Sequence, residues 1–391
     1  MPNIQTKNLT YKVFPLSQDG YTFHYIAHSK SLNEKLVYTT FEDKSFFLKI
    51  VQREHNTLIK YDKLTRIAPI KIIKDALKAF QKLHDLELSF SNIENKKEPQ
   101  HLEKSDTYLK KISYFAHNFK TDKEIWVEVG FGSGRHLLHQ ALAHPEIQFI
   151  GLEIHGPSIE QVIKQCKIQN IDNLLLCAFD ARIFLEFLPS NAVGKIFVHF
   201  PVPWDKKPHR RVISPAFIDE STRVLKEAGT LELRTDSENY YAYAYETFIS
   251  LQSCDLKIRK NQEIAISSKY EDRWKKQEKN IYDILLTNHE ISPAKAPITN
   301  LTFDKPISFA KIKATFTPHV YKGDDYFIHF ERLFEIDENR GIIKLSFGAF
   351  EKCEHKYLIF NDNKIQYFPY EALPIMQNLK SHKKIEEFLY A

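Results

Sequence analysis

Three glycines at alternate positions, Gly130, Gly132 and Gly134, directly follow a short apolar run that ends at Val129. The apolar run predicts a strand, and apolar residues recur at helical spacing after Gly134, so the stretch predicts a strand, a tight turn and a helix. Glycine lets a backbone turn sharply and approach a ligand where a Cβ would collide. The loop therefore suits a nucleotide-like group that lies against main-chain atoms.

Carboxylates at successive predicted strands narrow the ligand further. Glu128 lies inside the strand before the loop, Glu153 ends the second predicted strand, and Asp180 follows the third. A carboxylate at the position of Glu153 can accept two hydrogen bonds from a ribose diol. One at the position of Asp180 can accept a hydrogen bond from the amino group of adenine. A single acid after a strand is more often a helix N-cap. The three together, with Arg135 where a dinucleotide loop has its third glycine, predict a site for S-adenosylmethionine and not for nicotinamide.

A basic segment follows the fourth predicted strand and begins with a proline-rich turn and Trp204. Its cationic or titratable side chains are Lys206, Lys207, His209, Arg210 and Arg211. A run of charge by itself is usually a solvated surface. Because this run lies beside a tryptophan at a strand end, contact with the phosphates of a folded RNA is the better interpretation. Trp204 itself either stacks on a base or packs the turn, and both interpretations stay open.

The segment Pro201 to Arg211 resembles the bacterial tRNA (guanine-N7)-methyltransferases, whose pattern here is Pro-Asp-Pro-Trp followed by Lys, His and Arg. Two further stretches match that family: Arg234-Thr-Asp236, and Ser268-Lys-Tyr-Glu271 followed by Arg273. The resemblance covers residues 110–290. It implies a Rossmann-like class I methyltransferase that transfers a methyl group from S-adenosylmethionine to N7 of the guanine at position 46, in the variable loop of tRNA.

The resemblance also implies roles for individual residues. The cofactor side comprises Glu128, Gly130, Gly132, Gly134, Glu153, Asp180 and Val202. The tRNA side comprises Trp204, Lys206, Arg210, Arg211, Asp236, Ser268, Lys269, Tyr270 and Glu271. Val202 replaces the aspartate that the family has between its two prolines. Guanine N7 carries a lone pair and needs no general base, so the expected catalytic residues, Asp205, Asp236 and Glu271, would stabilise charge that grows on the purine.

The pattern of strands and helices predicts the domains. Residues 1–88 alternate as short antiparallel strands and end in a helix from Pro69 to Leu83, and residues 89–106 read as a linker. Residues 107–290 alternate strands with helices, which is typical of a doubly wound α/β sheet. Residues 291–391 return to strands and close with a helix near 370–389. We expect two small β-rich (α+β) accessory domains, which either extend tRNA binding, mediate self-association or pack against the core.

Composition sets broad limits. The chain of 391 residues is 43% hydrophobic with a net charge of +5, as in a globular protein that tolerates a polyanionic partner. Its four cysteines are scattered, which fits a reducing cytoplasm. No apolar run has the length of a membrane helix, so a cytoplasmic, soluble protein without a membrane partner is expected. His136 and His139 are expected on a helix surface, and no metal site is expected.

Two other classes of function stay open at this point. One is a class I methyltransferase that acts on another RNA, a protein side chain or a small molecule. The other is a non-catalytic tRNA-binding protein that lost activity with the aspartate at Val202. The basic segment after Trp204 disfavours the first, and the intact glycines with Glu153 and Asp180 disfavour the second. The sequence is compatible with a monomer or a homodimer.

Overall fold

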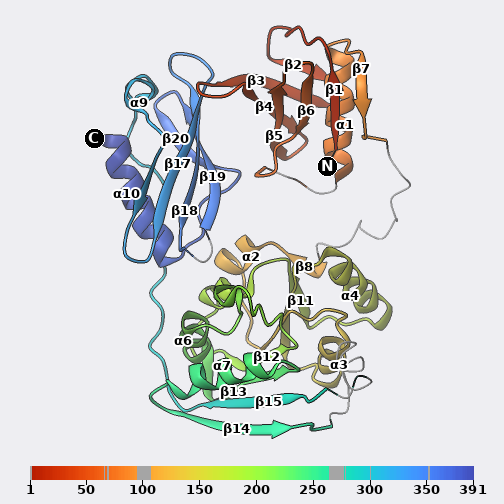
Figure 1. Cartoon of the computed structure of the whole chain (residues 1–391), viewed down its shortest axis with the longest axis vertical. Coiled ribbons are helices and arrows are strands. Elements are labelled where there is room, and N and C mark those ends of the chain that lie inside the picture. Colours follow the sequence, from red (N-terminus) through yellow and green to blue (C-terminus); the bar gives the residue numbers. More distant parts are fainter. Residues whose placement is uncertain are drawn as a thin grey trace. The chain divides into compact units, whose positions relative to one another are not determined.

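The chain forms two compact units, Pro99–Pro297 and a second unit that joins Met1–Glu98 to Ile298–Ala391 (Figure 1). The computed structural model describes residues 2–65, 67, 70–94, 107–263, 277, 279–299, 301–350 and 353–391. Within these ranges no helix is long and apolar enough to cross a membrane.

The unit of residues 99–297, which we call the methyltransferase unit, is built on an eight-stranded sheet of order β14-β15-β13-β12-β9-β10-β11-β8. Its strands are β8 (Leu109–Lys110), β9 (Ile125–Val129), β10 (Gln148–Leu152), β11 (Leu174–Cys177), β12 (Val193–His199), β13 (Leu225–Thr235), β14 (Cys254–Lys260) and β15 (Tyr282–Asn288). Strands β8 to β13 pair in parallel, whereas β15 and β14 are antiparallel to their neighbours. The predicted Rossmann-like, doubly wound sheet is confirmed.

Helices cover both faces of this sheet. They are α2 (Ile112–His117), α3 (Arg135–Ala143), α4 (Gly156–Gln169), α5 (Ala181–Phe184), α6 (Pro215–Val224) and α7 (Glu238–Ile249). Apolar residues of α5, α6 and α7 pack on one face, and those of α3 and α4 pack on the other. The order of strands reverses between β9 and β12, where ligands of such sheets bind outside the carboxyl ends of the strands.

The other unit, which we call the flanking unit, carries a sheet of twelve strands among its described residues. The N-terminal strands are β1 (Asn3–Thr6), β2 (Leu16–Gln18), β3 (Tyr21–Ser29), β4 (Glu34–Phe41), β5 (Lys44–Gln52), β6 (Thr57–Tyr61) and β7 (Leu88–Ser91). The C-terminal strands are β16 (His319–Lys322), β17 (Phe327–Glu335), β18 (Gly341–Gly348), β19 (Cys353–Asn361) and β20 (Lys364–Phe368). Helix α1 (Ile70–Leu83) packs on the first group, and α9 (Phe309–Thr315) and α10 (Met376–Tyr390) pack on the second.

The structure differs from the expectation of two separate accessory domains, because strands from both ends of the chain share one sheet. Strand β17 pairs with β3 through Phe334 opposite Ser29 and Glu335 opposite His28. Phe47 lies 5.2 Å from Tyr357, measured between ring centroids, in a core that both ends build. Pairing between segments so distant in the chain leaves no local pattern in the sequence.

The expected linker of residues 89–106 also differs at its start. Strand β7 runs to Ser91 and pairs with β1, so the sheet extends into the segment. Residues 95–106 lie outside the described ranges, as does Pro69 at the expected start of the first helix.

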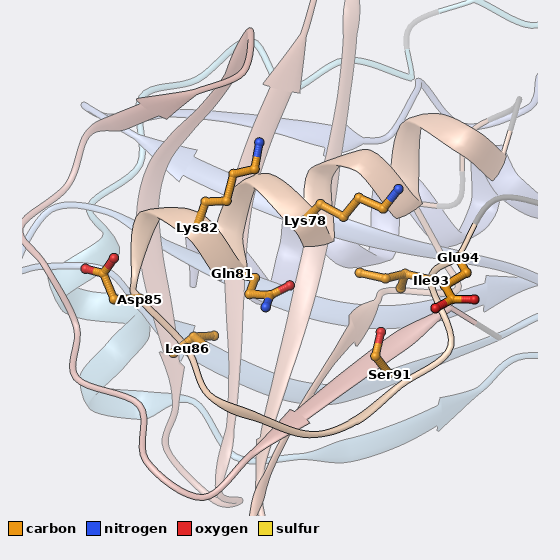
Figure 2. A pocket seen from close by; sticks show the side chains of 8 residues that line it. All are labelled: Lys78, Gln81, Lys82, Asp85, Leu86, Ser91, Ile93 and Glu94. Atoms are coloured by element: carbon orange, nitrogen blue, oxygen red, sulfur yellow. The ribbon is translucent and has the colours of Figure 1, made fainter.

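A pocket on the flanking unit lies between α1 and the segment that follows β7 (Figure 2). Its lining combines lysines, carboxylates and apolar side chains, namely Lys78, Gln81, Lys82, Asp85, Leu86, Ser91, Ile93 and Glu94. None of the residues that the sequence assigned to catalysis or to cofactor binding lines this pocket. The predicted glycine loop and the acids Glu153 and Asp180 lie instead at the strand ends of the methyltransferase unit.

Glu34 connects the two halves of the flanking unit by ion pairs. One of its carboxylate oxygens lies 2.8 Å from the Lys49 ammonium, and the other pairs with the guanidinium of Arg332. The three side chains are 16 to 21% exposed, so removal of the acid leaves two poorly solvated cations without it.

We expect Glu34→Ala to lower the free energy of unfolding of the flanking unit by about 1–3 kcal/mol, measured by urea denaturation with circular dichroism. The control is Glu387→Ala on α10, which removes an acid that is 66% exposed in its ion pair with Lys384. That variant should change stability by less than about 0.5 kcal/mol. Equal losses in the two variants would contradict this role of Glu34.

Candidate active site

The glycine loop after β9 has the backbone that its sequence predicts. Gly130, Gly132 and Gly134 have φ values of 68°, 52° and 72°, a left-handed region that favours glycine. A Cβ on Gly134 would lie 2.2 Å from a methyl group of Val162, so this glycine permits close packing of α3 against α4. A Cβ on Gly130 would meet no atom within 4 Å. The loop thus leaves open space beside its first glycine.

Glu153 lies just beyond β10 and holds the loops around it. Its Oε2 accepts a hydrogen bond of 3.0 Å from the amide of Gly132, and its Oε1 accepts bonds of 2.7 and 2.9 Å from the amides of Ile154 and His155. Three backbone donors therefore fix the orientation of the carboxylate beside the glycine loop. A carboxylate has about four acceptor positions, so this one retains capacity for a ligand hydroxyl.

Asp180 caps α5 and binds Arg182. Its Oδ1 accepts from the Arg182 amide and Nε at 3.1 Å each, and its Oδ2 accepts from Nη2 at 2.8 Å. The N-cap interpretation of this acid is therefore correct. The other guanidinium nitrogen, Nη1, donates to the carbonyl oxygen of His209 at 3.4 Å, which links the Asp180 turn to the basic segment.

Glu128 is 4% exposed and hydrogen-bonds His136 of α3, with 2.7 Å between Oε2 and Nδ1. The expectation that His136 lies on the helix surface is wrong: its side chain is 11% exposed, whereas His139 is exposed as expected. Burial by itself lowers the pKa of His136, but the charges of Glu128 and Glu232 and the hydrogen bond to Glu128 outweigh it and raise the pKa. The sequence missed this pair because it places the two side chains on different elements.

A second pair of the same kind adjoins the first. His199, at the end of β12, lies 2.8 Å from Glu232 of β13, measured between Nε2 and Oε1. The rings of His136 and His199 are 4.6 Å apart between centroids. Burial raises the pKa of Glu232, but the hydrogen bond from His199 and the positive charges of His199, Arg234 and His136 outweigh it and lower the pKa.

These residues form a polar row across one face of the sheet. Glu128 and Glu232 flank Phe197 in the strand register, so all three side chains point to the same side. One step further along, Arg234 is 2% exposed and lies 3.1 Å from Asp283. The signal available in the sequence was the acid between Leu231 and Leu233, a polar position inside an otherwise apolar strand.

The basic segment after β12 contains both exposed and buried cations. Lys206, Lys207 and Arg210 are exposed, and the Arg210 guanidinium lies 5.1 Å from the ring centroid of Trp204, which is 37% exposed. Val202 is 60% exposed.

Arg211 is different, because it is 8% exposed and holds the turn together. Its Nε donates to the carbonyl oxygen of Pro203 at 2.8 Å, and its Nη2 lies 3.4 Å from Asp205. The guanidinium also lies 4.6 Å from the ring centroid of Tyr243. Its surroundings give this arginine a structural role, whereas the sequence assigned it to the substrate.

Asp236 follows β13 and pairs with Lys279, with 2.9 Å between Oδ2 and Nζ. Its carboxylate is 18% exposed. The other expected substrate residues, Ser268, Lys269, Tyr270 and Glu271, lie outside the described residues. The site that can be described therefore combines the glycine loop, the acids after β10 and β11, the basic segment and Asp236.

We expect His136→Ala to lower the free energy of unfolding of the methyltransferase unit by about 2–4 kcal/mol, because it leaves Glu128 buried without its partner. His139→Ala, one turn along α3 on the exposed side, should change stability by less than about 0.5 kcal/mol. Tryptophan fluorescence in urea reports this unit, since all three tryptophans lie within residues 99–297.

The same pair of variants tests the protonation of His136. A pKa raised above the usual 6.5 contributes stability that is fully present below pH 6.5 and is lost as pH rises through the raised value. The stability difference between wild type and His136→Ala should therefore narrow toward alkaline pH. A difference that is constant or widens would contradict the charged pair.

Comparisons with known proteins extend beyond the methyltransferase unit. A family model described as "Putative methyltransferase" matches residues 122–284. The chain is 42% identical over 393 residues to the tRNA (guanine-N(7)-)-methyltransferase of Wolinella succinogenes, with 100% of both chains covered. It is 40% identical over 403 residues to the enzyme of that name from Campylobacter jejuni, covering 100% of this chain and 98% of the relative. For the Helicobacter hepaticus enzyme of that name the identity is 37% over 407 residues, with 100% and 99% covered.

These alignments include both ends of the chain, for which the sequence itself offered no resemblance. Identities near 40% along the full length, together with the Rossmann-like sheet and its glycine loop, decide the assignment. The chain belongs to the tRNA (guanine-N(7)-)-methyltransferase family.

Proposed function

We propose that this protein methylates N7 of the guanine at position 46 in the variable loop of tRNA, with S-adenosylmethionine as the methyl donor. The observation that carries the proposal is the pairing of a cofactor-type strand edge with the basic segment after β12. The two are linked through Arg182, which binds Asp180 on one side and the His209 carbonyl oxygen on the other. The names of the full-length relatives support the same reaction.

The residues around the glycine loop fit S-adenosylmethionine. Gly130 faces open space, Glu153 retains acceptor capacity for a ribose hydroxyl, and Asp180 is an ionisable acceptor beside the expected adenine. When bound, the cofactor supplies an electrophilic methyl group on a sulfonium sulfur. Glu128 is engaged by His136, so in this proposal it acts by holding α3 and the loop in place.

The acceptor nitrogen needs no proton removed, because N7 of guanine presents an in-plane lone pair at neutral pH. The residues of the chain then contribute by holding the base in line with the methyl group, and such alignment can account for about 7–11 kcal/mol of a barrier. Trp204 is half-exposed beside Arg210, and a purine can stack on it. Exposed Lys206 and Arg210 suit the phosphates around the target base.

A carboxylate beside the base stabilises the positive charge that develops on the purine and accepts hydrogen bonds from its N1 and N2 donors. Val202 cannot do this, so the role passes to other acids. Asp236 is the strongest of the described candidates, because it lies after β13 with 18% of its side chain exposed. Asp205 is 53% exposed and is bound to Arg211, and Glu271 is the third candidate. Arg211 is assigned to the structure of the turn in this proposal.

The defining experiment measures methyl transfer from labelled S-adenosylmethionine to unmodified tRNA transcripts that carry guanine or adenine at position 46. We expect incorporation with the guanine transcript alone, released as 7-methylguanine on digestion. Asp236→Asn should retain cofactor affinity and lower kcat by about 10²–10³. Incorporation into neither transcript, despite binding of both cofactor and tRNA, would overturn the proposal and favour a tRNA-binding protein. Equal incorporation into both would show a different target.

Cofactor binding is tested separately. Glu153→Gln retains the shape of the side chain but loses its charge. We therefore expect the dissociation constant for S-adenosylmethionine, measured by calorimetry, to rise roughly 10–100-fold. Glu160→Gln on the exposed side of α4 is the matched control and should bind normally. Normal affinity in Glu153→Gln would remove this residue from the cofactor site.

A further inference from the structure

The sheet of the flanking unit has a second face, opposite the one that α1 covers. Ile4, Ile50 and Ile59 point into the core beneath α1. Because side chains alternate along a strand, their neighbours on β1, β5 and β6 point to the other side. Asn3, Lys60 and Lys49 form one row of this face across β1, β6 and β5. We call it the β1–β6 face.

Next to that row stands an aromatic residue. Phe90 of β7 pairs with Gln5 of β1 in the strand register, so its ring lies on the same face, and it is 47% exposed. From β7 to β5 the face spans three strand spacings, or about 14 Å. It thus combines an exposed ring with partly buried amides and two partly buried lysines, of which Lys49 is paired with Glu34.

Several cations lie on or near this face, and the exposed acid Glu54 follows Arg53 in the chain. Arg53 and Lys63, at the ends of β5 and β6, are exposed. Within the described part of the chain no carboxylate forms an ion pair with Lys60, Arg53 or Lys63. Two acids close to the row are already engaged: Glu34 pairs with Lys49 and Arg332, and the Asp62 carboxylate accepts from the amides of Leu64 and Thr65.

Lys60 has the least favourable position of the group. Burial lowers its pKa, the charges of Lys49, Arg53 and Lys63 lower it further, and Glu34 alone opposes them. Repulsion among these like charges destabilises the folded protein, and a bound anion would reduce that repulsion. An acidic ligand therefore gains more from this face than from a lysine that is paired within the protein.

We propose that the β1–β6 face binds a short single-stranded stretch of tRNA outside the methylated loop, with phosphates at Lys60 and its neighbours and a base stacked on Phe90. Sheet faces that combine exposed aromatic rings with cations bind unpaired nucleotides in this manner, through stacking and phosphate contacts. The identity of the RNA as tRNA rests on the proposed function, whereas the face itself does not.

The test uses the full-length protein and unmodified tRNA transcripts. We expect Lys60→Glu to raise the dissociation constant for tRNA roughly tenfold at physiological salt. The slope of log Kd against log salt concentration should fall by about 1. The KM for tRNA should rise with the dissociation constant, while kcat at saturating tRNA and the affinity for S-adenosylmethionine stay unchanged. Lys71→Glu, on the exposed side of α1 and hence away from this face, is the matched control.

The aromatic contribution has its own variant. Phe90→Ala should weaken tRNA binding roughly fivefold without a change in the salt slope, and Phe90→Tyr should restore it. Lys63→Glu, in an exposed turn, repeats the charge test if Lys60→Glu does not fold. Folding of each variant is checked by its thermal midpoint.

The outcomes separate this inference from the proposed reaction. If wild type methylates tRNA but folded Lys60→Glu, Lys63→Glu and Phe90→Ala bind it normally, the β1–β6 face is not an RNA site and the reaction stands. If wild type binds tRNA and transfers no methyl group, weaker binding in the three variants still supports the face. If Lys71→Glu weakens tRNA binding as much as Lys60→Glu does, the effect comes from the net charge of the protein, and the inference is overturned.

Discussion

The buried contact between Glu128 and His136 is the interaction on which the site depends. It ties the strand before the glycine loop to the helix after it, so both ends of the loop are fixed by one hydrogen bond of 2.7 Å. A buried carboxylate is tolerated only with such a partner, because its desolvation is otherwise too costly. With α3 held in this way, Gly130 keeps its left-handed backbone and leaves space for a ligand.

The same pair begins a polar row that runs over β9, β12, β13 and β15. Hydrogen bonds and opposite charges alternate along it from Glu128 through His199 to Asp283, and each ionised group has at least one partner. A buried network of hydrogen bonds and opposite charges favours one arrangement of strands and helices over others. It places the rigid part of the site beside the carboxyl ends of the strands, where the basic segment begins.

Some cations of the protein stabilise the fold, and others are available to a ligand. Arg211 is buried against Tyr243 and the Pro203 carbonyl oxygen, so it shapes the turn, whereas Lys206 and Arg210 are free to meet solvent or phosphate. In the flanking unit Lys49 is engaged by Glu34, while Lys60 has no acid partner among the described residues. A cation that is engaged by groups of the protein stabilises the fold, whereas a cation without such partners is available to a ligand.

The sequence by itself determined the local elements and the class of the fold. Apolar runs, glycines and helical spacing are local signals, and they predicted the strand, turn and helix around Gly130 and the alternation of strands and helices in residues 107–290. The glycine loop, Glu153 and Asp180 could be predicted as a cofactor edge because the carboxyl ends of parallel strands meet at one edge of a sheet. The motifs around Trp204 and Asp236 identified the family because their residues match its pattern in the same order.

Tertiary structure decided which side chains meet. His136 resembles a surface histidine in sequence, and only the packing of α3 on the sheet brings it to Glu128. Arg211 and Lys206 belong to one basic run, yet burial separates their roles. The two ends of the chain form one sheet through β3 and β17, which no local pattern records. Periodicity fixes the face that each residue presents, whereas its partners depend on elements far away in the sequence.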